Sequence, residues 1–367
     1  MKERNCRKIV PWSFRADFNS DTTIRLASRV FEFAQEAICM TDPEGRIGYV
    51  NPAFTHTTGY TSEEALGKNP RVLKSGRHKD DFYKTMWLEL TEKGQWQGEI
   101  WNKRKNGQIY PETLNIHAVR NEESVLTHYV AIFHDITADV EMRKEVELAG
   151  RIQKNILRAD FSHEALKMKS IFLPYNHLGG DYYDYRWDEK NQIFRGFLFD
   201  VMGHGIVTAL QVSALRVLFR QAVERKLSLP EKMQWMNKES ISILPEDSFA
   251  GALLFEIDIL RGEMSYVMAG INHFLLFSKQ NPTAGLNVVS QPGLFLGISE
   301  QEEYEEHRCE LEPGDGVIFL TDGFYDRLLE QNVSLSKLDI PSLMNLLDSL
   351  AFQRGLFDDA TALGFIR

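Results

Sequence analysis

The segment 193–205 reads IFRGFLFDVMGHG, and it decides the fold of the C-terminal half of the chain. Its apolar run 193–199 has the length of a buried strand and ends at Asp200, so we expect that carboxylate at a strand end, where loops build functional sites. The glycines that follow allow a tight backbone turn. The apolar periodicity of residues 207–223 predicts a buried helix. A strand, an acidic loop and a helix are therefore expected in succession.

Three further acidic clusters accompany Asp200: Gly179-Gly180-Asp181, Thr321-Asp322-Gly323 and Asp358-Asp359-Ala360-Thr361. The apolar run 317–320 predicts a strand that delivers Asp322, and residues 360–366 predict a last strand just beyond Asp358 and Asp359. Each cluster places a carboxylate beside small residues, where a hard cation can be held and still be approached by a phosphate. We interpret the four clusters as one site at the strand ends of a β-sandwich.

Asp-Gly pairs are also common in surface turns, so Asp322-Gly323 alone would indicate an ordinary turn. Asp181 and Asp200 have aromatic and apolar neighbours, which places their carboxylates near buried surface. An unpartnered buried charge is costly, and a bound cation would relieve that cost.

Composition restricts the class of protein. The chain has 367 residues, of which 43% are hydrophobic and 26% charged, with a net charge of -10. This charge argues against nucleic acid or an anionic membrane as a main partner. Cys6, Cys39 and Cys309 are too few and too far apart for a disulfide framework or a cysteine zinc site. With no leader-like start and no membrane-spanning apolar run, the expectation is a soluble, cytoplasmic protein.

The N-terminal half reads as short strands around a few short helices. The turn 42–45 contains Pro and Gly, and Asn106-Gly107 is the strongest two-residue hairpin signal. The strands expected around these turns and after them are 38–40, 47–50, 96–103, 108–111 and 128–133.

Together with residues 51–54, 58–60, 63–67 and 135–137, this arrangement resembles a PAS domain along its whole length. We assign residues 26–138 to it, with residues 1–25 as an N-terminal extension. The resemblance implies a role in sensing a ligand, a cofactor or a partner.

The sensed signal is left open. The light-sensing subfamily carries a reactive cysteine where this chain has Pro70, which excludes photochemistry of that type. A non-covalent flavin or a haem is an alternative, and the side chains considered for these are Trp87, Trp96, Trp101, His56 and His78. We favour core or surface roles for these residues and assign no cofactor-binding residue.

Residues 139–160 are expected to form a helical linker, because residues 140–157 are rich in good helix formers. One stripe carries Met142, Val146, Ala149 and Ile156, with Gln153 as its polar member. A short two-stranded contact and packing on its own domain are both compatible with this stripe. The segment 152–157 resembles the linker ahead of the catalytic domain in sensor-coupled bacterial phosphatases, which implies signal transmission.

The four acidic motifs, in order and spacing, resemble the SpoIIE/RsbU-type branch of the metal-dependent serine/threonine protein phosphatases (PPM family) over residues 161–367. The segments 269–273 and 311–315 match further landmarks, although Ile271 displaces the usual Ala-Gly-His. The resemblance implies an α-β-β-α sandwich. The expected fold class is therefore α+β: an N-terminal PAS α/β sensor fold, a helical linker and the sandwich.

The resemblance also implies roles for individual residues. Asp200 would bridge two manganese or magnesium ions, Asp181 and the Val201 carbonyl would hold one, and Asp322 with Asp358 the other. Asp359 could exchange roles with Asp358. A water between the ions would attack phosphorus without a covalent phosphoenzyme. Asp184 is interpreted as a supporting or structural residue.

The acid that protonates the leaving group is an open point. Eukaryotic relatives have a histidine two positions after the bridging aspartate, where this chain has Met202. His204 is either its replacement or a solvent-facing turn residue.

The leading function is that of a sensor-regulated phosphatase, homodimeric through its PAS domain and linker. Its substrate would be a phosphorylated STAS-type anti-sigma factor antagonist in a partner-switching circuit. A diguanylate cyclase is an alternative suggested by residues 179–183, which lack the second acidic residue of that signature. A non-catalytic regulator that signals by binding alone is another.

Overall fold

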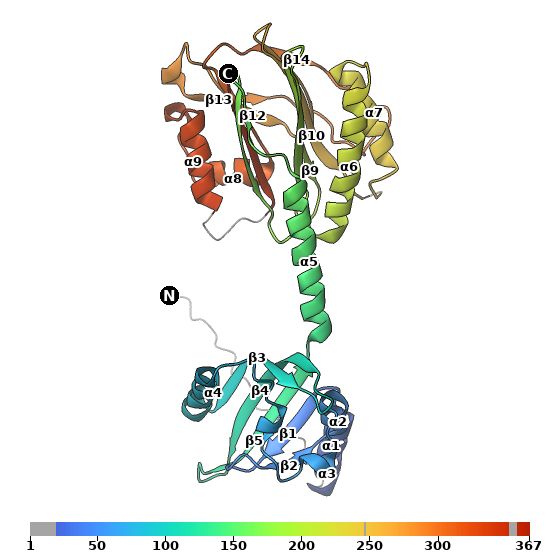
Figure 1. Ribbon diagram of the computed structural model, residues 1–367, viewed down its shortest axis with the longest axis vertical. Helices are drawn as coiled ribbons and strands as arrows, with labels where there is room; N and C mark the ends of the chain where they lie inside the picture. The colour runs from blue at the N-terminus through green and yellow to red at the C-terminus, as the bar shows by residue number, and fades with distance from the viewer. Residues whose placement is uncertain (1–19, 246, 352–357) are drawn as a thin grey trace, which may run out of the picture. The chain divides into compact units, whose positions relative to one another are not determined.

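The computed structural model describes residues 20–245, 247–351 and 358–367. The sequence expectations for residues 1–19, including Cys6 and most of the N-terminal extension, lie outside these ranges. Two units are distinguished, residues 1–143 and 144–367, and their boundary falls inside one long helix, α5 (Thr137–Ile156). Each unit is shown in Figure 1 and is described by itself.

An antiparallel five-stranded sheet forms the core of the first unit, with the strand order β2-β1-β5-β4-β3. The strands are β1 (Ala37–Thr41), β2 (Ile47–Val50), β3 (Gln95–Lys103), β4 (Ile109–Arg120) and β5 (Leu126–Asp135). Both hairpins and the closing strand predicted from the sequence are confirmed. The turns work as expected, because Gly45 and Gly107 adopt the positive φ values of +76° and +91°.

Short helices cover this sheet. They are α2 (Pro52–Thr58), α3 (Ser62–Ala65), η1 (Pro70–Leu73) and α4 (Asp80–Lys93), preceded in the chain by α1 (Ser20–Phe33). Asn51 caps α2 with its side chain, and Thr61 and Glu64 form a capping box on α3. Helix α1 was not expected. The rest of the arrangement is the PAS fold that the motifs predicted.

Helix α5 begins within the first unit and ends within the second. Its last two turns pack on the second unit, where Gly150 and Gln153 are buried and Ile156 contacts the core. Packing on its own domain, one of the two expectations for the stripe, is therefore present at this end. A two-stranded contact stays a prediction.

The second unit is a sandwich of two antiparallel sheets, as expected. One sheet has the order β14-β11-β10-β9-β8, and the other has the order β13-β12-β15-β16-β7-β6. The first consists of β8 (Asp181–Asp188), β9 (Ile193–Val201), β10 (Ala250–Asp258), β11 (Glu263–Ala269) and β14 (His307–Glu310). The second consists of β6 (Phe161–Ser162), β7 (Lys167–Leu173), β12 (His273–Phe277), β13 (Leu286–Ser290), β15 (Gly316–Leu320) and β16 (Ala360–Ile366).

Helices lie on the outer face of each sheet (Figure 1). Helices α6 (Ile206–Glu224) and α7 (Leu229–Ile241) cover the first sheet, and α8 (Asp322–Glu330) and α9 (Ile340–Ala351) cover the second. The short 3-10 turns η2 (Pro282–Ala284) and η3 (Leu335–Lys337) complete the unit. Aromatic side chains such as Phe194, Phe255 and Phe365 fill the space between the sheets. This four-layer packing confirms the α-β-β-α expectation.

Helix α6 is the one helix of the described ranges whose length and apolar composition would let it cross a membrane. Its inner face packs into the protein, with Val212, Leu215 and Phe219 buried against the first sheet. The sequence pattern predicted this helix at residues 207–223 as a core element, and the structure confirms it at Ile206–Glu224.

Candidate metal centre

Asp181 and Asp200 face each other across two neighbouring strands. Asp181 begins β8, Asp200 is the last residue but one of β9, and the antiparallel register pairs them directly. Directly opposed residues on neighbouring strands hold their side chains close together. Like charges at such positions repel, so this pair destabilises the sheet unless something neutralises it. Two of the four acidic motifs therefore meet at this position.

Thr321 links the two sheets at the same edge. Its hydroxyl donates to Asp181 Oδ2 at 2.7 Å, and it accepts the Thr361 N–H at 2.8 Å. Asp322 follows Thr321 as the first residue of α8, and Asp358 and Asp359 precede β16. All four acidic motifs thus reach one edge of the sandwich. The sequence motifs include Thr321 and Thr361 but did not predict that these residues would link the two sheets.

The carboxylates of this edge perturb one another. Burial raises the pKa of Asp181 well above its usual range, and the neighbouring Asp200 raises it further. Burial raises the pKa of Asp200 to about 8, with added repulsion from Asp322, Asp358 and Asp359. The pKa of Asp322 is also raised, first by burial and then by Asp358. Clusters that hold several carboxylates at raised pKa are typical of functional sites.

Both carboxylate oxygens of Asp359 accept hydrogen bonds from backbone N–H groups. Its Oδ1 accepts the Tyr175 N–H at 2.6 Å, and its Oδ2 accepts the Gly180 N–H at 2.5 Å. Its residue is only 2% exposed, whereas Asp358 is exposed. Asp359 therefore fixes the segment that leads into Asp181. Of the two adjacent carboxylates, Asp358 is the one directed to solvent at the acidic edge.

The glycines of the motifs permit close backbone approach. A Cβ at Gly180 would lie 2.4 Å from the Val201 carbonyl oxygen, and one at Gly323 would lie 2.0 Å from the Asp359 carbonyl oxygen. Since no side chain fits at either position, both glycines are needed to bring their neighbouring aspartates together.

The acidic edge carries the kinds of oxygen ligand that a hard divalent cation prefers. Asp181 Oδ1 is buried and has no hydrogen-bond partner within the described part of the chain. Carboxylate and carbonyl oxygens are the ligands that magnesium and manganese prefer. Across residues 20–245, 247–351 and 358–367, however, no three His, Cys, Asp or Glu side chains are gathered tightly enough to hold one ion. The carboxylates at this edge raise one another's pKa values, but their side chains do not converge on a single point.

Met202 and His204 lie in the loop that follows β9, and Ile271 lies beside the strand partner of Asp200. Met202 is 52% exposed and His204 is exposed, with its ring 5.6 Å from that of Tyr175. Ile271 is buried and packs under Gly251, the residue paired with Asp200 on β10. Ile271 therefore packs against the strand that pairs with β9 at Asp200.

Asp184 belongs to a separate ion cluster. It is 2% exposed and accepts from Arg158 Nε at 2.9 Å and from Arg220 Nε at 3.1 Å. Arg216 Nε lies 3.8 Å from the same carboxylate. Three arginines on one buried aspartate form a structural network that ties the end of the linker to α6. This placement agrees with the structural interpretation of Asp184.

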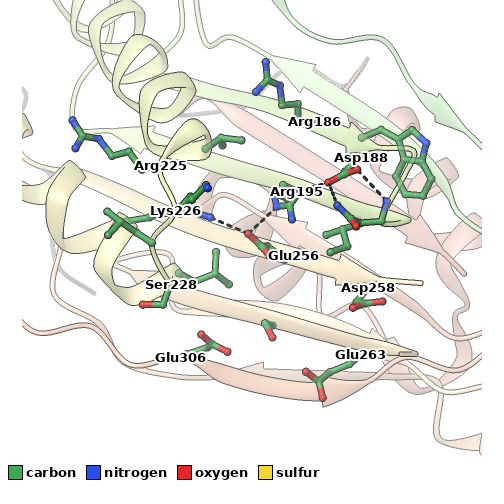
Figure 2. Close-up of a pocket in the computed structure, with 18 of the residues that line it drawn as sticks. Arg186, Asp188, Arg195, Arg225, Lys226, Ser228, Glu256, Asp258, Glu263 and Glu306 are labelled. Carbon is green, nitrogen blue, oxygen red and sulfur yellow. Dashed lines mark hydrogen bonds and ion pairs between the residues drawn. The ribbon is translucent and has the colours of Figure 1, made fainter. Parts of the chain in front are cut away.

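A polar groove of about 870 Å³ lies at the opposite ends of the same strands (Figure 2). At its centre, Glu256 Oε1 accepts from Arg195 at 3.1 Å and from Lys232 at 3.2 Å. Arg195 also pairs with Asp188, the last residue of β8. The central charges of this groove are paired with one another, and none of the predicted metal ligands lines it.

Comparison with known proteins agrees with both halves of this description. Residues 194–361 match the family model of stage II sporulation protein E (SpoIIE), and residues 35–138 match a PAS domain model. The chain joins a PAS domain to a SpoIIE-type domain.

Two curated relatives match different parts of the chain. The nitrogen fixation regulatory protein of Klebsiella oxytoca is 35% identical over 129 residues, which are 34% of this chain and 26% of the relative. The phosphoserine phosphatase RsbP of Bacillus subtilis (strain 168) is 28% identical over 188 residues, which are 50% of this chain and 46% of the relative. The chain thus matches less than half the length of either relative.

Among solved structures, the SiaA-PP2C domain of Pseudomonas aeruginosa is similar with a TM-score of 0.50 and 17% sequence identity. The match covers 63% of this chain and 99% of that chain. At this level of identity the likeness bears on the fold alone.

Proposed function

We propose that the SpoIIE-type domain hydrolyses phosphoserine or phosphothreonine on a partner protein with the help of divalent metal ions. The observation that carries the proposal is the direct pairing of Asp181 with Asp200, with Asp322 and Asp358 close enough to raise the pKa values of their neighbours. The similarity to a phosphoserine phosphatase supports the same reaction.

The candidate ligands of two manganese or magnesium ions are Asp181, Asp200, the Val201 carbonyl, Asp322 and Asp358. When bound, such ions would lower the pKa of a water molecule and neutralise charge on the phosphate. Thr321 orients Asp181 through its hydrogen bond, and Asp359 holds the segment before Asp181 through two backbone N–H groups. Asp359 is therefore assigned a positioning role in place of the metal-binding role considered as an alternative.

The surface beside the acidic edge favours a protein substrate. Met202, Ile206, Val207 and Leu210 are each at least half exposed at the start of α6 and the loop before it. Exposed apolar side chains gathered beside a site are typical of protein interaction surfaces. The substrate proposed is the phosphorylated STAS-type anti-sigma factor antagonist that the family resemblance implies.

Regulation by the PAS domain is proposed to pass through α5. The helix is hydrogen bonded through Gln153 to Gly179, two residues before Asp181. A homodimer formed through the PAS domain and α5 would fix the position of this helix and order the acidic edge. Sedimentation of the full chain tests the dimer. A chain cut near Phe161 that keeps the same activity and regulation would contradict the coupling.

The reaction is tested by incubating the purified full chain with Mn²⁺ and a candidate phosphorylated antagonist protein and measuring released phosphate. The native chain should release phosphate only with the metal, and Asp200→Asn should abolish the release. Asp188→Asn is the matched control, because Asp188 lies on β8 at the end away from the acidic edge. This control should retain the native rate.

The phosphate assay and a parallel incubation with GTP separate the two alternatives. A chain that binds the phosphoprotein but releases no phosphate, with or without Mn²⁺, would be a regulator that signals by binding alone. Formation of a cyclic dinucleotide from GTP would identify a diguanylate cyclase. The clusters around Asp322 and Asp358 have no role in that second reaction.

A further inference from the structure

A small pocket of about 120 Å³ lies between the end of the linker and helix α6 in the second unit. The charged side chains that line it are those of Arg158, Asp184, Arg186, Arg220 and Glu224, and we call it the arginine pocket. A cavity needs only about 10–15 Å³ to hold one water molecule, so this pocket has room for a polyatomic ion. None of the proposed metal ligands lines it.

Positive charge exceeds negative charge around the arginine pocket. The guanidinium groups of Arg158, Arg216 and Arg220 lie 2.9, 3.8 and 3.1 Å from the buried carboxylate of Asp184. The other pair, Arg186 with Glu224, is neutral as a whole and more than half exposed. One carboxylate therefore faces three cations that do not lose their protons in proteins. This local excess stands out in a chain whose net charge is -10.

Asp184 cannot accept from all the donors that surround it. Its Oδ1 accepts from Arg158 Nε, and its Oδ2 accepts from Arg220 Nε and lies 3.1 Å from Arg220 Nη2. Within the described ranges, both Nη atoms of Arg158 and Nη1 of Arg220 make no hydrogen bond or ion pair. These two side chains are 49% and 50% exposed and line the pocket, so a ligand can reach them.

The third arginine has a buried donor without an acceptor. Arg216 Nε makes no hydrogen bond in the described part of the chain, because its 3.8 Å separation from Asp184 Oδ2 is too long for one. A buried donor of a charged group that stays unsatisfied destabilises the folded state. Oδ2 is held by Arg220 in this arrangement. If Arg220 turned toward another acceptor, Oδ2 could approach Arg216.

The competing explanation is a purely structural network. In that case Asp184 would only hold the linker end to α6, and water would satisfy the remaining donors. The excess of charge favours a ligand, because buried ionic clusters are normally compensated by opposite charge. The guanidinium fork also matches the oxygen atoms of a phosphate group. Asp184 already holds Arg158 and Arg220 in place, which lowers the cost of ordering them around a ligand.

We propose that the arginine pocket binds a tetrahedral dianion of the phosphate type between Arg158 and Arg220. Asp184 positions the two guanidinium groups. Arg158 follows the last residue of α5 by two positions and Arg220 belongs to α6, so the bound anion joins the linker end to α6. The site is separate from the acidic edge, and the proposal does not depend on the phosphatase reaction.

The test measures binding of phosphate and of sulfate to the full chain in buffer free of divalent metal, where the acidic edge repels both anions. Calorimetry at an ionic strength held constant with chloride gives the affinity. Hydrogen exchange of residues 153–160 and 206–224 locates the site. We expect one saturable site with a Kd of about 1 mM or below for both anions, and slower exchange in both segments.

A third probe, O-phosphoserine, identifies the source of the phosphate group. It presents the same dianion on an amino acid. Tighter binding of O-phosphoserine than of phosphate would assign the pocket to a phosphorylated chain. Weaker binding would assign it to the free ion. Either result supports a phosphate-type site.

Substitutions of Arg220 separate the site from general charge effects. Arg220→Gln should weaken phosphate binding by about ten-fold or more, because charge-assisted hydrogen bonds are lost. Arg220→Lys keeps the positive charge beside Asp184 but removes the planar fork, so it should weaken binding to a smaller extent. Arg151→Gln is the matched control, because it removes the same charge from an exposed position of α5 outside the pocket. The control should keep the native affinity.

Three results would overturn the proposal. The absence of saturable binding of phosphate and sulfate to the native chain would mean that the network is purely structural. Equal losses in Arg151→Gln and Arg220→Gln would mean that the anions respond only to overall charge. Slower exchange confined to segments other than 153–160 and 206–224 would place the anion elsewhere. If Arg220→Gln does not fold, Arg220→Lys decides, and native affinity in that variant counts against the site.

Discussion

The side-chain amide of Gln153 makes two hydrogen bonds to the backbone of Gly179. Its Nε2 donates to the Gly179 carbonyl oxygen at 2.7 Å, and its Oε1 accepts the Gly179 N–H at 3.0 Å. The Gln153 residue is 6% exposed, so water does not compete for these bonds. Helix α5 is thereby joined to the segment that positions Asp181.

Replacement of Gln153 by Ala should weaken metal binding at the proposed site. Two buried backbone groups lose their partners, each at a cost of about 1–3 kcal/mol, and Gly179 becomes free to shift. We expect the Mn²⁺ concentration for half-maximal phosphate release to rise by about ten-fold or more. Lys154→Ala changes an exposed neighbour and should leave it unchanged. An unaltered Mn²⁺ dependence in Gln153→Ala would refute the positioning role.

Gly150→Ala should destabilise the contact between α5 and the second unit. In an exposed helix interior this change normally stabilises by about 1 kcal/mol. Here the added Cβ would lie 2.0 Å from the His177 carbonyl oxygen, so the helix or the segment around His177 has to move.

Hydrogen exchange decides whether Gly150→Ala destabilises or stabilises this part of α5. Hydrogen exchange of residues 145–156 in the full chain should become faster in Gly150→Ala. Leu148→Ala, at an exposed position of the same helix, provides the baseline. Slower exchange in Gly150→Ala would mean that the helix does not pack as described.

Asp358 and Asp359 should respond differently to substitution by Asn. Asp359→Asn replaces a carboxylate that accepts two backbone N–H groups, so we expect a loss of about 1–3 kcal/mol in the free energy of unfolding. Asp358→Asn should leave stability within about 0.5 kcal/mol of native, because this residue is exposed, while phosphate release falls strongly. Both variants are measured by urea unfolding and by the phosphate assay. If Asp358→Asn loses stability and Asp359→Asn keeps it while losing phosphate release, the roles of the two aspartates are exchanged.

Much of this fold was predictable because local chemistry agrees with the global structure. The hairpin turn is set by Asn106-Gly107, and strand β9 is set by the apolar run that ends at Asp200. Strand β16 has the bounds that were predicted from its residues. The convergence of the four acidic motifs was inferred from their shared residue types and strand-end positions and then supported by a family resemblance, since nothing local in the sequence brings residue 181 to residue 321.

Other features depend on contacts between distant residues and had no sequence signal of their own. Gln153 appeared only as the polar break in an apolar stripe, although it faces a glycine 26 positions later. The burial of Asp359 depends on hydrogen bonds from backbone groups at residues 175 and 180. The buried Glu112 was missed because an alternating strand pattern does not distinguish a cavity from a packed core.

Glu112 should make the stability of the PAS unit depend on pH. Burial raises its pKa from 4.5 to about 7, with Asn102, Tyr110 and Arg104 lowering it in part and Asp135 raising it. Between these two values the folded unit binds more protons than the unfolded chain, so its stability is greatest below pH 4.5 and falls as the pH rises to 7. The loss amounts to about 3 kcal/mol.

Glu112→Gln removes this titration, so the comparison of native and variant chains isolates it from other groups. The stability of the variant relative to native should increase by about 2–3 kcal/mol between pH 5 and pH 8 and stay level above that. Hydrogen exchange of β4 peptides across urea unfolding of the full chain reports on this unit. Glu123→Gln, at an exposed site of the same unit, should show no such trend. A difference between native and Glu112→Gln that is independent of pH would mean that Glu112 keeps the same charge throughout, and that its burial is compensated by groups other than those described.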